Sequence, residues 1–420
     1  MALNEREDTA DSVEITTRLR VATRVGASRN MVASAAPNRT TYSADVSGRS
    51  DRGTERWRPM RAAVLHGVGE PLTIEDVKLD NPWPHEVVVR TAACGVCRSD
   101  LHFIEGHYGT DLPVVLGHEA AGVVEAVGSE VTYVQPGDRV ITCMSVFCGR
   151  CADCTGGRPY LCTSPDVRRG PDDPSRLTLD GERVAQLYEL SAYAEQMLVH
   201  ENATVKVRDE MPLDRAALIG CAVMTGFGAV VNTARVSPGA TVAVIGCGGV
   251  GLSAVNAAAI TGAGRIIAVD VAEAKLSLAN LVGATDVVDA SRENPVEAVL
   301  ELTAGGVDFS FEALGRRETA EQSFRMLRSG GTATVIGMVP EGEMVQVEAA
   351  KLLEEKTLQG SNMGSNRFRV DMPLLVEHYL EGRLLLDEVT ARHIHLDEVD
   401  DAFHEMRTGA LGRSIVVFDG

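Results

Sequence analysis

The sequence predicts an α/β protein in two parts, a β-rich unit followed by a parallel, doubly wound sheet. Its 420 residues exceed one ordinary hydrophobic core and indicate two or three domains. From Met60 onward, short apolar runs are separated by turn residues, as in strand-rich structure. Near residue 240, strands begin to alternate with helices, and that alternation specifies a parallel sheet with helices on both faces.

Residues 1–59 differ in composition from the rest of the chain. They hold ten Arg, no Lys and no sustained apolar period, so we expect a disordered extension or a segment upstream of a true start at Met60. Eight acidic residues argue against a mitochondrial presequence, and no apolar core segment suggests a secretory signal. We therefore expect a cytoplasmic protein.

The order of strands and helices supports the two-part division. In the β-rich unit, strands bounded by Gly, Pro or Asn are predicted at 61–65, 86–90, 122–127 and 138–141. In the second part, a strand at 241–245 precedes a small-residue helix at 249–260, and further strands are predicted at 265–269, 307–311 and 332–336.

Composition and charge disfavour two kinds of partner. With 45% hydrophobic and 24% charged residues, the chain has the composition of a soluble globular protein. We find no run of 18 or more uncharged apolar residues, so a membrane partner is not expected. The net charge of −19 repels nucleic acid phosphates and anionic lipids. A small-molecule partner remains.

A glycine-rich loop joins the strand at 241–245 to the following helix. Its residues match G-x-G-x-x-G and are Gly246, Cys247, Gly248, Gly249, Val250 and Gly251. In this context, glycines permit the turn, a close approach of pyrophosphate and helix packing, while the helix N-terminus faces the phosphates. Asp270, after the next strand, would bond both ribose hydroxyls and repel a 2′-phosphate, which predicts NAD rather than NADP. The alternative is a helix-packing turn with a surface aspartate.

Four cysteines lie within 15 residues: Cys148, Cys151, Cys154 and Cys162. Four thiolates close a tetrahedral zinc shell and leave no open position, so the spacing predicts a structural zinc site. A disulfide pair does not suit a reducing compartment. An iron–sulfur cluster would need a redox partner that hydride chemistry does not require.

Three further candidate ligands are scattered along the chain: Cys97, His118 and Cys221. Taken singly, each has an ordinary structural explanation, because a lone cysteine is usually a small buried hydrophobe. A lone histidine is usually a satisfied polar residue. The spacing of the three residues alone does not show that they belong to one site.

From about Met60 to Gly420 the chain resembles the zinc-dependent medium-chain dehydrogenases, in the long-loop branch of the alcohol dehydrogenase family. Its ordered motifs are Cys-Arg-Ser-Asp-x-His from Cys97, Gly-His-Glu-Ala-Ala-Gly from Gly117, the four cysteines, Cys221 and the glycine loop. The resemblance implies a GroES-like β-rich catalytic domain at 60–223 and 364–420, with a zinc lobe at 143–165. A Rossmann NAD-binding domain is implied at 224–363. The loop at 163–192 resembles that of dimeric members and implies a homodimer.

The resemblance also implies the catalytic residues. Cys97, His118 and Cys221 resemble the catalytic zinc ligands, which gives two zinc ions per chain with the four-cysteine site. Asp100 is similar to the residue that orients the ligand histidine. Glu119 is similar to a carboxylate that approaches the metal during ligand exchange.

The remaining implied roles concern the proton relay and the cofactor. Ser99 and His102 resemble the family's proton relay. Thr225 resembles a residue beside the nicotinamide. The implied pyrophosphate and ribose contacts are Arg98, Arg413 and Lys275.

The implied reaction is reversible hydride transfer between a primary alcohol and NAD. Three protein ligands leave zinc one position for substrate oxygen, and the cation would lower the pKa of an alcohol bound there. The proton would leave through Ser99, the nicotinamide ribose and His102. Ser99 lacks the methyl of threonine, and Met144 stands where many relatives carry an aromatic ring. We therefore expect a bulky aromatic, terpenoid or medium-chain primary alcohol.

Three rival functions can be weighed against this. A glutathione-dependent formaldehyde dehydrogenase has an arginine shortly after the fourth lobe cysteine. Asp166 falls there with Arg168 and Arg169 close by, which leaves a mycothiol-dependent enzyme open. A polyol dehydrogenase usually has glutamate where Cys221 stands. A zinc-ribbon binding protein, from a different class, would have no use for Asp270.

Overall fold

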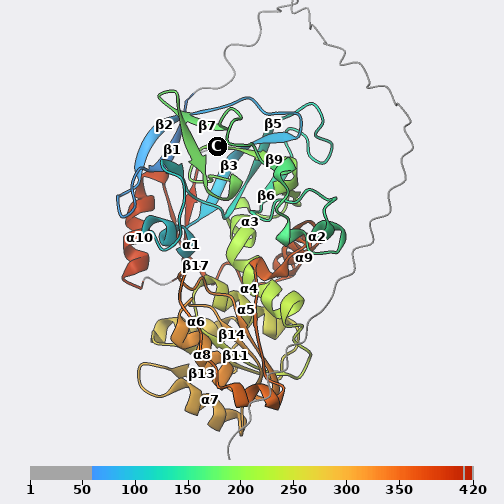
Figure 1. Cartoon of the computed structure of the whole chain (residues 1–420), viewed down its shortest axis with the longest axis vertical. Helices are drawn as coiled ribbons and strands as arrows, with labels where there is room; N and C mark the ends of the chain where they lie inside the picture. The colour runs from blue at the N-terminus through green and yellow to red at the C-terminus, as the bar shows by residue number, and fades with distance from the viewer. Residues whose placement is uncertain (1–58, 410–411, 419–420) are drawn as a thin grey trace, which may run out of the picture. The chain divides into compact units, whose positions relative to one another are not determined.

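The computed structural model describes residues 59–409 and 412–418. That part of the chain forms a closed barrel and two sheets, with helices around them (Figure 1). All of the extension predicted at 1–59 except Pro59 lies outside the described residues.

The first part of the described chain, joined by two strands from its C-terminal end, builds the barrel and a largely antiparallel sheet. The barrel follows the order β1 (Met60–Leu65), β2 (Thr73–Leu79), β7 (Leu177–Leu179), β8 (Glu182–Gln186) and β4 (Val114–Val115). The sheet follows the order β10 (Thr204–Lys206), β6 (Arg139–Thr142), β5 (Ala120–Val127), β3 (Glu86–Gly95), β18 (Arg413–Val417) and β17 (Thr390–Ile394), and β9 (Gln196–His200) also pairs with β3. Segments from both halves of the chain therefore share one sheet.

β3 is longer than the strand predicted at 86–90. It pairs antiparallel with β5 along most of its length, with β9 over its first half and with β18 over its last residues. These neighbours satisfy its backbone groups as far as Gly95, which a local sequence pattern does not reveal.

The second sheet is parallel throughout. Its order is β13 (Asp286–Asp289), β12 (Arg265–Asp270), β11 (Thr241–Ile245), β14 (Val307–Glu312), β15 (Leu327–Val335) and β16 (Thr357–Gly360). Val242 and Val244 pack on one face, and Ala243 and Ile245 pack on the other. Apolar residues on both faces are typical of a buried parallel sheet.

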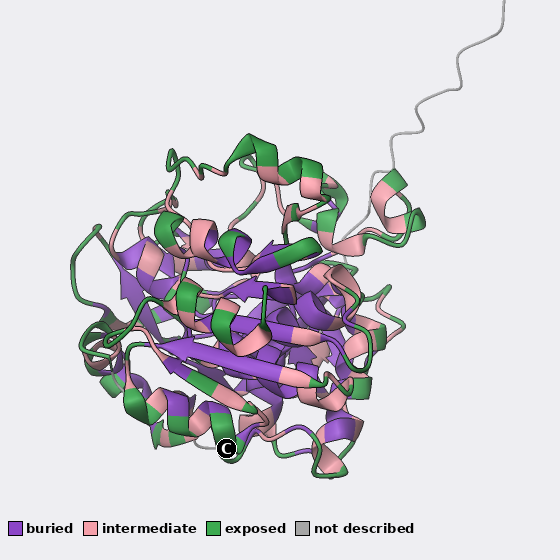
Figure 2. Ribbon diagram, turned by 90° about the horizontal axis from the view of Figure 1, so that it is seen from below, coloured by how far each residue is buried: buried purple, intermediate pink, exposed green. Residues whose placement is uncertain are grey.

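Helices cover both faces of this sheet (Figure 2). Buried residues of α5 (Gly249–Ile260) and α6 (Glu273–Leu281) join the core of Val244. Buried residues of α7 (Pro295–Thr303) and α8 (Arg317–Arg325) join the core of Ile245. The predicted doubly wound fold is thus confirmed, and β11 and α5 have the predicted bounds.

The remaining helices lie mostly around the antiparallel part. The α-helices are α1 (Arg98–Ile104), α2 (Ala152–Thr155), α3 (Leu213–Leu218), α4 (Met224–Gly228), α9 (Phe368–Leu380) and α10 (Val399–Arg407). The 3₁₀ turns are η1 (Pro159–Leu161), η2 (Pro165–Val167), η3 (Leu187–Glu189), η4 (Glu201–Ala203), η7 (Ala349–Glu354), η8 (Met363–Ser365) and η9 (Leu396–Glu398), and the π-helical turns are η5 (Ile219–Val223) and η6 (Ala229–Thr233).

One helix of the described chain is unusually apolar. The successive turns from α3 to η6, Leu213–Thr233, are by length and composition alone sufficient to cross a membrane, although they contain no run of 18 uncharged apolar residues. Polar residues such as Thr225 and Asn232 break the run of apolar residues in the sequence. In the fold, 83% of the most apolar segment of this helix is buried. It packs in the core shared by the two parts of the described chain. Packing therefore accounts for its apolarity.

Candidate functional site

Three elements bring Cys97, His118 and Cys221 together. Cys97 caps the N-terminus of α1, His118 lies between β4 and β5, and Cys221 lies in the π-helical turn η5. All three are buried, and their ligand atoms lie within 4.8 Å of one another. Within the described residues, Nε2 of His118 has no hydrogen-bond partner. A buried imidazole nitrogen without a partner, beside two thiols, fits a zinc ion.

Asp100 fixes the orientation of His118. Its Oδ1 lies 3.0 Å from Nδ1 of His118 and accepts the amide of Gly117 at 3.0 Å. Its Oδ2 accepts the hydroxyl of Tyr193 at 3.0 Å. Burial alone would lower the pKa of His118, but Asp100 and Cys97 raise it well above its usual value. The hydrogen bond to Asp100 places a proton on Nδ1, so the neutral ring of His118 presents Nε2 as a metal ligand.

Glu119 joins the ligand cluster to the other end of the chain. Its side chain is fully buried, forms an ion pair with Arg413 and accepts the amide of Ala222 at 3.2 Å. Burial raises the pKa of Glu119 to about 7, against the opposing effect of Arg413. Arg413 also donates to the carbonyl of Val96 at 3.1 Å. The metal-exchange role implied for Glu119 stays a prediction.

The glycine loop lies at the other side of Arg413. A Cβ at Gly249 would overlap Nη1 of Arg413, and a Cβ at Gly251 would overlap the carbonyl oxygen of Gly246. At Gly248, by contrast, no atom of the described chain lies within 4 Å of a Cβ position. Gly248 caps the N-terminus of α5. Open space beside a helix N-terminus fits a pyrophosphate group.

Asp270 lies beside this loop, at the end of β12, and is 6% exposed. Its Oδ2 accepts the amide of Cys247 at 2.8 Å, and its Oδ1 accepts the amides of Val271 and Ala272 at 2.8 and 3.1 Å. A carboxylate offers about four lone pairs, so about one remains for a ligand. The sequence argument had expected two ribose hydrogen bonds, and this count favours one.

The four lobe cysteines also converge. Their ligand atoms lie within 4.8 Å of one another, and two sulfur pairs, Cys148–Cys154 and Cys151–Cys162, are 3.9 Å apart. Sulfurs bound to tetrahedral zinc at about 2.3 Å lie about 3.8 Å apart. The amides of Arg150 and Cys151 lower the pKa of Cys148 to about 6, which favours the thiolate. All nine cysteines lie in the described part and none forms a disulfide.

Comparison with known proteins gives the family. An alcohol dehydrogenase GroES-like domain matches residues 83–209, and a zinc-binding dehydrogenase domain matches residues 249–377. An alcohol dehydrogenase zinc-binding domain protein from Burkholderia ambifaria is 34% identical, with a TM-score of 0.83, over 87% of this chain and 100% of that chain. The chain belongs to the zinc-dependent medium-chain alcohol dehydrogenase family.

Two further structures are similar to this alcohol dehydrogenase family member. Benzyl alcohol dehydrogenase from Acinetobacter calcoaceticus is 34% identical, with a TM-score of 0.80, over 86% of this chain and 99% of that chain. A zinc-binding dehydrogenase from Sinorhizobium meliloti 1021, bound to NADP, is 30% identical, with a TM-score of 0.73, over 86% of this chain and 99% of that chain. The chain is therefore an oxidoreductase that uses zinc and a nucleotide cofactor. The zinc-ribbon alternative is excluded.

The dehydrogenase's implied relay residues share one helix, α1. Ser99 and His102 are partly exposed and three positions apart, so they lie on neighbouring positions of one face. Nδ1 of His102 lies 3.1 Å from Nδ1 of His107. Burial, together with the charges of His107 and Arg98, lowers the pKa of His102. Arg98 is exposed and donates to the carbonyl of Met406 at 3.2 Å.

The other implied cofactor and pocket residues lie as follows. Thr225 is buried in α4, and its hydroxyl contacts Sδ of Met363 at 3.4 Å. Lys275 is partly exposed in α6, close enough to Cys247 to influence the pKa of its thiol. Met144 is partly buried and packs against the core that contains Cys97 and Cys221.

Sequence reasoning missed Tyr188. Its ring meets the rings of His118 and Phe103 edge to face, each at 5.5 Å between centroids. Tyr188 has φ +53°, Glu189 +64° and Ser191 +61°, a concentration of left-handed backbone in one short segment. Such strain gathers at functional sites. The sequence carries no signal of it, because none of the three residues is a glycine.

A buried ion network holds the loop that carries Tyr188. Arg169 is 4% exposed, bonds Glu86 and Asp80, and stacks over Trp83 at 4.4 Å. Arg176 bonds Glu86 at 2.8 Å and Glu189 at 2.6 Å. Burial alone would raise the pKa of Glu86, but the two arginines bring it below its ordinary value. Arg169 is therefore fully engaged within the protein.

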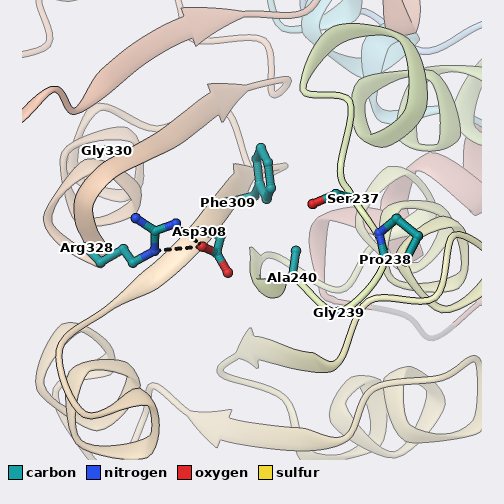
Figure 3. Close-up of a pocket in the computed structure, with 8 residues that line it drawn as sticks. All are labelled: Ser237, Pro238, Gly239, Ala240, Asp308, Phe309, Arg328 and Gly330. Atoms are coloured by element: carbon teal, nitrogen blue, oxygen red, sulfur yellow. Dashed lines mark hydrogen bonds and ion pairs between the residues drawn. The ribbon is translucent and has the colours of Figure 1, made fainter.

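A separate cavity of about 320 Å³ lies at the opposite end of the parallel sheet, where β11 and β14 begin (Figure 3). Arg328 and Asp308 on its wall bond each other at 2.6 Å, and Asp308 also accepts the amide of Thr241 at 2.7 Å. None of the candidate zinc ligands lines this cavity, so it is separate from the candidate active site.

Proposed function

We propose that the chain is an NAD-dependent alcohol dehydrogenase that oxidises bulky primary alcohols reversibly to aldehydes. The observation that carries this proposal is the buried set of Cys97, His118 and Cys221, one ligand short of a tetrahedral zinc shell, linked through Arg413 to the glycine loop. A zinc ion held there would supply Lewis acidity that makes an alcohol more acidic.

The chain's own residues supply the rest of the chemistry. Asp100 holds the tautomer of His118. Ser99 is proposed to receive the alcohol proton and His102 to release it to solvent, since both are partly exposed on α1. Thr225 and Arg98 are proposed to contact the cofactor, with Lys275 near its adenosine ribose. The four lobe cysteines are proposed to hold a second, structural zinc, because their sulfur separations match a closed tetrahedral shell.

The cofactor is proposed to be NAD, although one similar structure binds NADP. Asp270 supports NAD because a buried carboxylate beside the loop repels a 2′-phosphate. The residue's one remaining acceptor position suits a ribose hydroxyl.

The substrate proposal rests on the side chains near the ligand cluster. Met144 is flexible and unbranched, and the ring of Tyr188 stands edge-on to His118. Phe103 packs against Tyr188. An apolar, aromatic wall favours benzylic, terpenoid or medium-chain alcohols over ethanol, because each buried methylene adds about 1–3 kcal/mol to transition-state binding.

A thiol-dependent formaldehyde dehydrogenase is the second candidate. The engagement of Arg169 with Glu86 and Asp80 counts against a glutathione carboxylate at that arginine. Asp166 pairs with Arg150, and Arg168 is exposed and pairs with Glu189 at 3.9 Å. A mycothiol-dependent enzyme is the form of this candidate that remains.

A homodimer in the cytoplasm completes the proposal. The long loop after the zinc lobe supports the dimer by its resemblance to dimeric members. Nine free cysteines support a reducing compartment.

The test is NAD reduction at 340 nm on a panel of alcohols, with and without glutathione or mycothiol. We expect benzyl alcohol to give a higher kcat/KM than ethanol, without added thiol. Met144→Phe should shift preference toward ethanol, while the 72% exposed Met344→Phe, a matched control, should not. Ethanol as the best substrate, or a strict thiol requirement, would contradict the proposal.

A further inference from the structure

Two residues beside the relay histidine have no part in the function proposed above. His107 and Glu105 follow α1 and lie next to His102. One ligand atom from each of the three lies within 4.8 Å of the others. The side chains of His107 and Glu105 are 45% and 30% exposed, so solvent reaches the group.

The backbone brings these side chains together. α1 ends at Ile104, Glu105 is its C-cap residue, and Gly106 follows with φ +72°. The amide of His107 donates to the carbonyl of His102 at 2.9 Å, and the amide of Gly106 donates to that of Phe103 at 3.2 Å. This pair of bonds is a Schellman motif, which fixes the turn. The turn therefore brings the imidazole rings of His102 and His107 together without a bound ligand.

The two rings are hydrogen-bonded, and their separation is close to that of two ligands on one metal ion. Nδ1 of His102 lies 3.1 Å from Nδ1 of His107, and Oε2 of Glu105 lies 3.7 Å from the latter. Nitrogens bound to a tetrahedral zinc ion at about 2.0–2.1 Å lie about 3.3 Å apart. Imidazole and carboxylate ligands suit zinc and neighbouring divalent transition metals.

We propose that His102, Glu105 and His107 form a third, exchangeable site for a divalent transition metal ion, distinct from the two cysteine-rich sites. Water completes the coordination shell, since the group is partly exposed. Arg407 competes for Glu105, because its Nε lies 3.1 Å from Oε1. An ion bound here occupies Nδ1 of His102. Where His102 acts as the proposed relay, the ion slows alcohol oxidation, and this second consequence rests on the proposed function.

Equilibrium dialysis of the holoenzyme against Zn²⁺, with metal analysis, tests the site. We expect one zinc per chain beyond those of the cysteine sites. His107→Ala should weaken that additional binding by about tenfold or more. Arg407→Gln should strengthen it by releasing Glu105. The exposed His404→Ala in α10 is the matched control and should leave it unchanged. Additional zinc bound equally well by His107→Ala would overturn the proposal.

The same preparations separate this proposal from the relay assignment. The rate of alcohol oxidation is measured with and without excess Zn²⁺, and the ratio of the two rates is compared between variants. Inhibition that is lost in His107→Ala supports the site and the relay together. Binding that depends on His107 without any inhibition supports the site and removes His102 from the relay.

Discussion

Asp270→Ala tests how the cofactor is selected. In the folded chain this carboxylate accepts the amides of Cys247, Val271 and Ala272 and keeps about one acceptor position for a ribose hydroxyl. The substitution therefore removes a charged hydrogen bond to NAD, and it removes the negative charge that repels a 2′-phosphate. It also leaves three backbone amides without their partner.

The expected size follows from those contacts. A hydrogen bond to a charged group contributes about 1.5–3 kcal/mol, so kcat/KM for NAD should fall by about tenfold to one hundredfold. Loss of the three amide bonds disturbs the loop for both cofactors alike and cancels in their ratio. The ratio of kcat/KM for NADP to that for NAD should rise by about tenfold or more.

Initial rates at 340 nm with each cofactor varied give the ratio directly. Asp289→Ala is the matched control, because Asp289 pairs with Asp270 in register at the end of the neighbouring parallel strand. We expect the control to leave the ratio unchanged. A ratio that Asp270→Ala leaves unchanged, or that Asp289→Ala raises equally, would refute a role for Asp270 at the ribose.

Three other predictions concern metals, stability and the N-terminal segment. Metal analysis should find two zinc ions per chain before any excess zinc is added. The Cys97→Ser variant should fold with one zinc ion fewer and have little activity, whereas the Cys151→Ser variant should give less soluble protein. Arg169→Met removes one of the two buried arginine partners of Glu86 and leaves Arg176, so it should cost about 1.5–3 kcal/mol and lower Tm by about 2–4 °C for some 350 folded residues. An unchanged Tm by calorimetry would contradict the network's role. A chain starting at Met60 should match the full chain in Tm and turnover, and loss of soluble protein would show that the removed segment is structural.

The sequence predicted the fold class and the glycine loop well because both depend on local patterns. Strand and helix periodicity located β11 and α5, and the loop between them follows from glycine spacing. The four lobe cysteines are equally local. Cys97, His118 and Cys221 come from three distant segments, so the resemblance to a family, and not spacing, was needed to join them.

What the sequence could not reveal depends on long-range contacts. The pairing of Glu119 with Arg413 joins residues 294 positions apart, and no pattern at either position indicates it. Tyr188 reaches His118 through left-handed backbone that its own sequence does not favour. The three amides that occupy Asp270 likewise depend on how the loop folds back on β12. Contacts of this kind reflect tertiary packing, which overrides local preference.

The position of β18 has a consequence for synthesis of the protein. β18 lies in the interior of its sheet, between β3 and β17, and brings Arg413 to Glu119. A ribosome adding about 5–20 residues per second releases Glu119 about 15–60 s before Arg413. For that interval the sheet has a gap, and the carboxylate beside the metal ligands lacks its cation. The three candidate zinc ligands are therefore all synthesised before Arg413, so zinc that binds during translation meets a site whose Glu119 is still without its arginine partner.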